Sequence, residues 1–265
     1  MAKKKEDELE YVKNGKRLDG RKVDELRKIK LEVGVMQRAD GSAYIEWGQN
    51  KIIAAVYGPR EALPKHIQDP YKALVNYQYR MATFSVPDRK QPKPGRREVE
   101  ISKVSGEALE KAIFLERFPN TTIDVFVEVL DSNAGTRVAA LVAASLALVD
   151  AGIPMRDMVA AVGVGKAGGH IILDLDKEEE DAPDAIDIPL AILPRIEEIV
   201  LLQMDGLMTR EEWDKAVELG LKGCRQVYEM QREALRKKFA EAEKMEEAPA
   251  DAEIAAAGEQ EEKGE

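Results

Sequence analysis

The sequence contains one cysteine, two histidines and few aromatic residues among its 265 positions. A single cysteine, Cys224, excludes a disulfide framework and is typical of a reducing compartment, so we expect a cytoplasmic protein. His66 and His170 lie far apart, which excludes a multi-histidine metal site and argues against a Ser–His triad. The longest apolar run, residues 138–149, is shorter than the roughly 20 residues of a membrane span, and the first residues lack the pattern of a signal peptide. We therefore expect no membrane partner.

Negative charge is concentrated near the end of the sequence. Residues 240–265 hold ten acids and two bases, whereas residues 1–239 hold 40 acids and 38 bases. The body of the chain is nearly neutral, so the net charge of −10 does not argue against a nucleic-acid partner. We divide the chain into a charged, loosely ordered arm (residues 1–16), one main domain (residues 17–244) and an acidic, disordered tail (residues 245–265).

Strand and helix patterns alternate through the body of the chain. Period-two alternation predicts strands over residues 29–35, 74–81 and 121–130, and a hairpin over residues 38–58. Apolar spacing predicts helices over residues 98–118, 134–151 and 209–243. A second hairpin is expected over residues 158–175, followed by strands at residues 186–193 and 199–204. Strands before, between and after three helices predict a two-layer α+β domain.

The stretch DSNAGTR, residues 131–137, joins a predicted strand to an apolar helix. Asp131, Ser132 and Asn133 are good helix-capping residues, and Gly135 would let the backbone approach a ligand. Free N–H groups at a helix start bind anions. Arg137 is a cation in the first turn, where it opposes the helix dipole, and a bound anion would explain it. The alternative is a capped helix with a surface arginine.

A strongly basic stretch precedes another predicted helix. Residues 80–103 hold seven bases and three acids, and Arg96 and Arg97 stand at the end of its irregular loop. Arginine and lysine contacts to phosphates position a nucleic acid without reading its sequence. The alternative, a solvated basic loop, is the usual explanation for one such loop taken alone.

Six acids crowd into EEEDAPDAID, residues 178–187. Like charges this close destabilise a fold unless something positive offsets them. Asp181 and Asp187 could hold Mg²⁺ together, or one could act as an acid and the other as a ligand. Glu178, Glu179 and Glu180 are expected to face solvent. The alternative is an acidic turn with no ligand.

Other motifs do not lead to a site. The glycines at 163, 165 and 168 match GxGxxG, but a strand follows them rather than a helix, so they indicate a hairpin turn. Cys224 has apolar neighbours in a predicted helix and is expected in the core. An anion pocket, a basic loop and a carboxylate pair remain, without a candidate covalent nucleophile. This combination suits phosphoryl transfer, in which positioning and charge stabilisation carry the chemistry.

Several stretches together resemble the RNase PH family, in the family's order and over roughly residues 15–240. The last of these stretches, residues 199–213, resembles the catalytic RNase PH-like subunit of the archaeal exosome more than bacterial RNase PH. The stretches are RLDGR (17–21), DGSAYIEWG (40–48), RREVEISKV (96–104), DSNAGTR (131–137), LDLDKEEEDAPDAIDIP (173–189) and IVLLQMDGLMTREEW (199–213).

The resemblance implies a ribosomal protein S5 domain 2-like fold and phosphorolysis of single-stranded RNA. Inorganic phosphate, as co-substrate, would attack the terminal 3′ phosphodiester and release a nucleoside diphosphate. The resemblance assigns roles by position. Gly135, Thr136 and Arg137 would hold phosphate, Arg96 and Arg97 the RNA backbone, and Lys65 and His66 the channel entry; Asp181 would be general acid or metal ligand, Asp187 a Mg²⁺ ligand, and Asp184 an assistant to both.

The resemblance also implies partners. Catalytic subunits of this kind form a hexameric ring, a trimer of heterodimers, with a related non-catalytic subunit, and RNA-binding cap subunits attach to it. Two alternatives remain open: a non-catalytic RNA-binding ring subunit, and a self-sufficient bacterial-type RNase PH that trims tRNA 3′ ends. A non-catalytic subunit would be expected to lack the acid pair or the phosphate-binding arginine, and both are present here.

Overall fold

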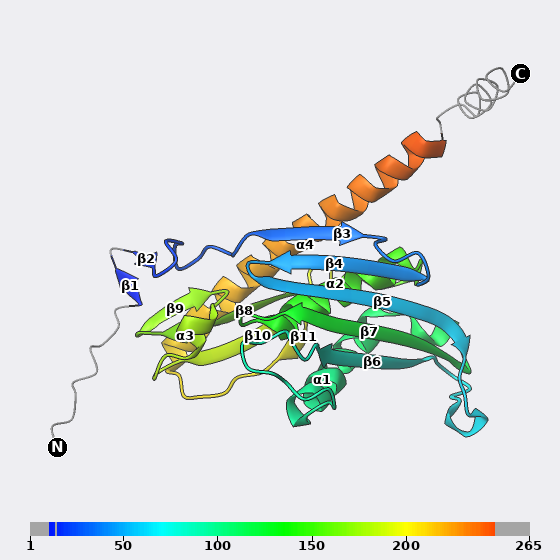
Figure 1. Cartoon of the computed structure of the whole chain (residues 1–265), viewed down its shortest axis with the longest axis horizontal. Helices are drawn as coiled ribbons and strands as arrows, with labels where there is room; N and C mark the ends of the chain where they lie inside the picture. Colours follow the sequence, from blue (N-terminus) through cyan, green and yellow to red (C-terminus); the bar gives the residue numbers. More distant parts are fainter. Residues whose placement is uncertain (1–10, 14, 247–265) are drawn as a thin grey trace, which may run out of the picture.

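The computed structural model describes residues 11–13 and 15–246, and its larger sheet has five strands (Figure 1). The strand order is β3-β4-β5-β7-β6, with β6 parallel to β7 and the other neighbours antiparallel. A parallel pair needs a crossover connection, and helix α1 supplies it. The strands are β3 (Ile29–Val33), β4 (Gly41–Trp47), β5 (Asn50–Glu61), β6 (Leu74–Met81) and β7 (Thr121–Asp131).

A smaller antiparallel sheet forms from the second half of the chain, in the order β11-β10-β8-β9. Every buried residue in the two central strands is apolar, and long apolar runs of this kind are typical of a sheet covered on both faces. A third, two-stranded sheet lies near the N-terminus. The strands of these sheets are β8 (Ala160–Ala167), β9 (His170–Leu173), β10 (Ile186–Leu193) and β11 (Glu198–Leu202), with β1 (Val12–Lys13) and β2 (Lys16–Arg17).

Helix α2 (Thr136–Asp150) lies between the two larger sheets. It packs on β4 and β5 of one sheet and on β8 and β10 of the other. Residues 138–148 are all buried because the helix is apolar on every side. Burying a valine or leucine side chain contributes about 1.5–3 kcal/mol, so this helix is the centre of the core.

The remaining helices cover the outer faces. Helix α1 (Arg96–Ala112) packs on β6 and β11, and the long α4 (Arg210–Glu246) packs on β8 and projects away from the sheets at its C-terminal end (Figure 1). Short helices are α3 (Lys177–Glu180), η1 (Lys65–Ile67) and η2 (Leu115–Arg117). No helix within residues 11–13 and 15–246 has the length and apolar character to cross a membrane.

The predicted α+β class is confirmed, and most element boundaries agree with the pattern. The helix predicted over residues 98–118 instead ends at Ala112, because Ile113 bridges to Met155 and the N–H of Phe114 donates to the carbonyl of Pro154. Part of the predicted loose arm pairs as β1 and β2, while residues 1–10 and 14 lie outside the described residues. The predicted tail loses its first two residues to α4, and residues 247–265 also lie outside the described residues.

Candidate active site

A cavity of about 690 Å³ opens where the larger sheet meets α1, α2 and α3. Its walls come from segments far apart in sequence: the loop after β6, the start of α1, the β7–α2 junction and α3. Phe84, Arg97, Thr136, Lys177 and Glu180 are among the lining residues. The cavity therefore brings together three of the stretches in which the sequence placed chemistry.

The β7–α2 junction borders this cavity through Ser132, Asn133, Ala134 and Thr136. Ala134 and Gly135 both have left-handed backbones, with φ of 50° and 67°, and Gly135 is the N-cap of α2. No side chain caps the helix, so the predicted capping by residues 131–133 is wrong. Uncapped N–H groups at a helix start leave room for an anion. The Thr136 hydroxyl, also buried, accepts a hydrogen bond of 2.8 Å from the hydroxyl of Tyr79.

Arg96 and Arg97 occupy the first turn of α1, and both are exposed. Arg97 lines the cavity, whereas Arg96 is not among the lining residues. Glu98 anchors this turn: its carboxylate accepts from the N–H of Gly95 at 2.5 Å and pairs with Lys90 at 2.9 Å. The pair ties the basic loop to the helix and leaves the arginines free to meet an anion.

Arg137 projects from the first turn of α2, and only 18% of its side chain is exposed. Its guanidinium lies 3.3 Å from the carboxylate of Glu100, on α1. The charge that the sequence left without explanation is therefore balanced in part within the chain. Glu100 itself is 45% exposed, so water screens its carboxylate and the pair contributes little to stability; Arg137 can therefore turn to a ligand at small cost.

Asp187 is an acid close enough to Arg97 and Arg137 for their charges to act on it. It lies on β10 opposite Gly165 of β8. Burial, together with the nearby charge of Glu180, raises the pKa of Asp187 to about 6, while Arg137 and Arg97 act in the opposite direction. One carboxyl, a second carboxylate and two guanidinium groups are thus close enough to influence one another. Their chemistry is that of a site for phosphate groups and a cation.

Asp181 lies at the C-terminal end of α3, with 62% of its side chain exposed. Its carboxylate pairs with Lys177 at 2.5 Å, and Glu180, rather than Asp181, is the acid that acts on Asp187. Asp184 points to a different place, because it accepts from the N–H groups of Gly168 and Gly169 and holds the β8–β9 turn. Its expected assistance to the other two acids is not supported by these contacts.

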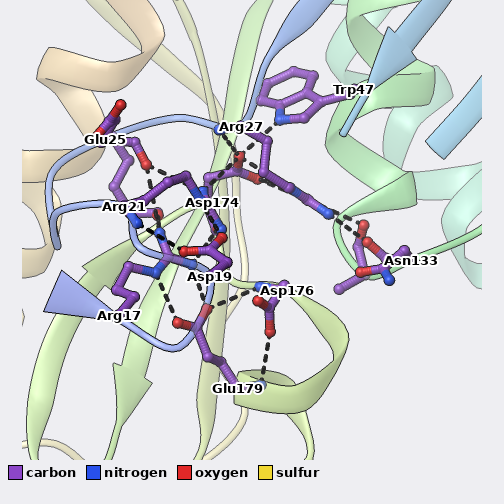
Figure 2. Close-up of polar contacts among 12 residues, drawn as sticks. Arg17, Asp19, Arg21, Glu25, Arg27, Trp47, Asn133, Asp174, Asp176 and Glu179 are labelled. Atoms are coloured by element: carbon purple, nitrogen blue, oxygen red, sulfur yellow. Dashed lines mark hydrogen bonds and ion pairs between the residues drawn. The ribbon is translucent and has the colours of Figure 1, made fainter. Parts of the chain in front are cut away.

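Glu179 contradicts the expectation that residues 178–180 face solvent. Its side chain is fully buried and forms a two-pronged ion pair with Arg17, which Figure 2 shows beside α3. Its carboxylate also accepts from the N–H of Asp176 at 3.0 Å, while the Asp176 side chain accepts from the N–H of Glu179 at 3.0 Å. This reciprocal capping box fixes α3, and with it the direction in which Glu180 points.

Lys65 and His66 lie away from this cavity. They form η1, in the loop between β5 and β6, and both are exposed. Strand β6 has eight residues, and the cavity lies beyond its Met81 end, whereas η1 lies before its Leu74 end. At about 3.3 Å per residue, the strand alone separates the two places by more than 20 Å. The structure therefore does not bring these residues together with Arg97 and Arg137.

The oxygen donors near the cavity suit Mg²⁺, which proteins hold through one or two carboxylates together with water and substrate phosphates. Asp187 and Glu180 are two such carboxylates, and a cation between them would offset the burial and the repulsion that together raise the pKa of Asp187. Within residues 11–13 and 15–246, no group of three or more histidine, cysteine, aspartate or glutamate side chains is arranged to hold a metal by itself.

Sequence reasoning missed several residues of this site. Phe84 and Ser85 line the cavity from the loop after β6, and Glu180 lies beside Asp187. Arg27 is buried beneath the β7–α2 junction. No local pattern marks Arg27, since its partners are more than 100 positions away. The aromatic Phe84 within a basic stretch was a signal that could have been used, because aromatic rings stack on bases.

Two family descriptions match most of the chain. Domain 1 of the 3′ exoribonuclease family (RNase_PH) matches residues 25–154, and domain 2 of the same family (RNase_PH_C) matches residues 157–223. Among solved structures, rice Rrp46 is similar, with a TM-score of 0.72 and 28% identity, covering 82% of this chain and 98% of that chain. The Archaeoglobus fulgidus exosome with RNA bound to the active site gives a TM-score of 0.69 at 22% identity, covering 85% and 93%, and this likeness concerns the fold alone.

Curated archaeal proteins are much more similar in sequence. The exosome complex component Rrp41 of Thermococcus onnurineus is 59% identical, covering 90% of this chain and 96% of that protein. Its counterpart in Pyrococcus abyssi is 61% identical (85% and 90%), and that of Archaeoglobus fulgidus is 56% identical (91% and 94%). The cavity, the fold and these similarities agree: the chain belongs to the RNase PH family of 3′ exoribonucleases, among its archaeal exosome members.

Proposed function

We propose that this chain is the catalytic subunit of an exosome-type ring that shortens single-stranded RNA from its 3′ end by phosphorolysis. The observation that carries the proposal is that Arg97, Thr136 and Glu180 line one cavity at the start of α2. Asp187 lies close enough to Arg97, Arg137 and Glu180 for their charges to act on it. Two guanidinium groups and free N–H groups suit phosphate, and carboxylates suit a metal or a proton. The names of the archaeal relatives support the assignment to an exosome.

Inorganic phosphate would bind at the start of α2, where Gly135 and Thr136 offer backbone N–H groups and Arg137 offers its charge. Arg97, with Arg96 beside it, would hold the RNA backbone near the 3′ end. A phosphate oxygen then forms a bond to the terminal phosphorus while the bond from phosphorus to the 3′ oxygen of the preceding nucleotide breaks. The products are a nucleoside diphosphate and an RNA shorter by one nucleotide.

The leaving 3′ oxygen needs a proton, which the attacking hydrogen phosphate loses as its new bond forms, and we assign the transfer of that proton to Asp181. This residue must first part from Lys177, with which it is ion-paired. Asp187 would hold Mg²⁺, with Glu180 as the neighbouring carboxylate. The cation would supply positive charge to offset that of the reacting phosphate groups. Neither role needs a covalent intermediate with the protein, so the absence of a candidate nucleophile from the motifs is expected.

The ring and its other members are part of the same proposal. A related non-catalytic subunit would alternate with this chain in a hexamer, and RNA-binding cap subunits would attach to it. The strands β11, β9, β3 and β6 are sheet edges within the described residues, and Leu207 is 94% exposed. Sheet edges and exposed large apolar side chains support the association of this chain with other subunits. Lys65 and His66 would then meet RNA at the channel entry. The one buried cysteine suits a reducing cytoplasm.

The test uses single-stranded RNA labelled at its 5′ end, incubated in Mg²⁺ with the full chain, alone and with the related subunit. Shortening should require inorganic phosphate and release nucleoside diphosphates. Arg137→Gln should lower kcat/KM by about 100-fold or more, because it removes a charge aimed at the reacting groups. Arg156→Gln is the matched control, since Arg156 also pairs with a glutamate, Glu116, but does not line the cavity.

Two outcomes would contradict the proposal. Release of nucleoside monophosphates without phosphate would show hydrolysis. Bound RNA that is never shortened, with or without the related subunit, would identify a non-catalytic ring subunit. A third outcome concerns the assembly: shortening by a homohexamer of this chain alone would favour a self-sufficient enzyme of the bacterial type.

A further inference from the structure

A buried charge cluster lies beneath the loop that leads into α2. At its centre is Asp174, directly after β9, with 1% of its side chain exposed. One carboxylate oxygen accepts from Nη2 of Arg27 at 2.7 Å, and the other accepts from the backbone N–H of Arg27 at 2.7 Å and from the indole N–H of Trp47 at 2.9 Å. Figure 2 shows these groups converging on Asp174. Asp174 thus holds Arg27 by both backbone and side chain.

The other side of the Arg27 guanidinium holds the loop. Its Nη1 donates to the carbonyl of Asn133 at 2.5 Å, and its Nη2 lies 3.4 Å from the carbonyl of Ala134. A Cβ added at Gly135 would lie 3.1 Å from Nη2, so the guanidinium packs directly against the loop. In Figure 2 the Arg27 side chain reaches from Asp174 across to Asn133. Arg27 therefore bridges two segments that are about 40 positions apart.

This bridge determines where the loop's N–H groups point. In a planar trans peptide the C=O and the following N–H point in opposite directions. The carbonyls of Asn133 and Ala134 point at Arg27, so the N–H groups of Ala134 and Gly135 point away from it. Arg27 lines a neighbouring cavity of about 440 Å³ that shares Gln49, Asn133 and Lys177 with the 690 Å³ cavity, whereas Ala134 and Thr136 line only the 690 Å³ cavity. The N–H groups of Ala134 and Gly135, which point away from Arg27, therefore point toward the proposed phosphate site.

The loop needs such support because its conformation is costly. Ala134 has a left-handed backbone, with φ of 50°, which a residue with a side chain adopts only where its surroundings hold it. Asn50 also holds the loop, because its side-chain amide donates to the Ala134 carbonyl at 2.7 Å and accepts from the N–H of Asn133 at 2.5 Å. Without Arg27, the peptides at 133–135 would keep the hydrogen bonds to Asn50 but lose those to the guanidinium.

We propose that Arg27 is a positioning residue for the phosphate co-substrate, and that Asp174 fixes it in place. The inference rests on the proposed function, because it names what orients that function's anion site. Asp174 remains charged in this role. Burial raises the pKa of Asp174, but the charge and hydrogen bonds of Arg27 outweigh burial, and the pKa is lowered.

The experiment compares Arg27→Lys and Asp174→Asn with the wild-type chain, each assembled with the related subunit. Asp157→Asn is the matched control: Asp157 is 6% exposed and accepts from Tyr228, Met158 and Arg195, far from the cavity. We expect both test variants to raise KM for phosphate about tenfold, the loss of roughly one positioned hydrogen bond, with kcat and KM for RNA within about threefold of wild type. Asp157→Asn should lower the melting temperature about as much as the two test variants do, but it should leave KM for phosphate unchanged.

A second measurement needs neither catalysis nor a variant. Inorganic phosphate added to the wild-type assembly should slow amide hydrogen exchange in residues 134–137. This keeps the inference separate from the proposed function: RNA that is not shortened would refute the function, while protection by phosphate would still support the positioned site. The inference is overturned if Arg27→Lys is folded and keeps the wild-type KM for phosphate, if Asp157→Asn raises that KM equally, or if phosphate gives no protection.

Discussion

Asp187 should cost the folded chain stability at neutral pH, and Asp187→Asn should recover it. Burial, with a contribution from Glu180, raises the pKa of Asp187 from its usual 3.8 to about 6. A difference of this size corresponds to an upper bound of roughly 3 kcal/mol between the ionised and neutral forms. Asparagine has nearly the same shape and carries no charge. We therefore expect the unfolding free energy of the Asp187→Asn chain to exceed that of wild type by about 1–3 kcal/mol at pH 7.5.

The stability difference between wild type and Asp187→Asn should depend on pH in one direction. The unfolded chain releases the Asp187 proton near pH 3.8, whereas the folded chain keeps it to about pH 6. Stability from the protonated carboxyl is therefore fully present below pH 3.8 and is lost as the pH rises through 6. The advantage of asparagine should be greatest above pH 7 and should nearly vanish at pH 4.

The assay is urea unfolding at pH 4, 5, 6 and 7.5, in EDTA, followed by circular dichroism. Asp181→Asn is the matched control, because Asp181 is 62% exposed and its loss removes an ion pair rather than a buried charge, so it should give no gain. Mg²⁺ should then stabilise wild type at pH 7.5 more than Asp187→Asn. An Asp187→Asn chain no more stable than wild type at pH 7.5, or equally favoured at pH 4, would refute the reasoning.

Three further predictions concern the frame of the site. Glu179→Gln should lower the unfolding free energy by about 3 kcal/mol or more, because it leaves a buried arginine charge unpaired; a loss below 1 kcal/mol in urea unfolding would contradict this. Gly165→Ala should cost about 2–4 kcal/mol by calorimetry, since its Cβ would overlap the carbonyl of Ile186, and unchanged melting would be the opposing result. Lys65→Ala with His66→Ala should weaken binding of long RNA and leave turnover of short oligonucleotides unchanged; equal effects on both would place η1 at the cavity.

Local patterns predicted what depends on neighbours in sequence. The apolar run at residues 134–151 became α2, and the hairpin predicted over residues 38–58 became β4 and β5, because helix and strand periods depend on residues a few positions apart. The helix predicted to residue 118 failed where a distant partner intervened, since Met155 pairs with Ile113. Its apolar spacing continued, but the backbone found a better partner in the tertiary structure.

Glu179 shows the same limit within the site. Its neighbours are acids, and local charge alone places it in solvent. Its partner Arg17 lies 162 positions away, and only the closing of β9 and α3 over the N-terminal segment brings the two together. A buried charge of this kind cannot be recognised from composition, because the residue that neutralises it is not nearby in sequence.

The sequence by itself determined the α+β class, the strand-to-helix junction that holds DSNAGTR, and the residue types from which an anion and cation site could be built. Only the tertiary structure decided which acid meets the arginines: Asp187, with Glu180 beside it, while Asp181 pairs with Lys177. The reason is physical. Hydrophobic period and turn chemistry act over a few residues, whereas electrostatic partners are chosen by which ends of which strands and helices the packed core places side by side.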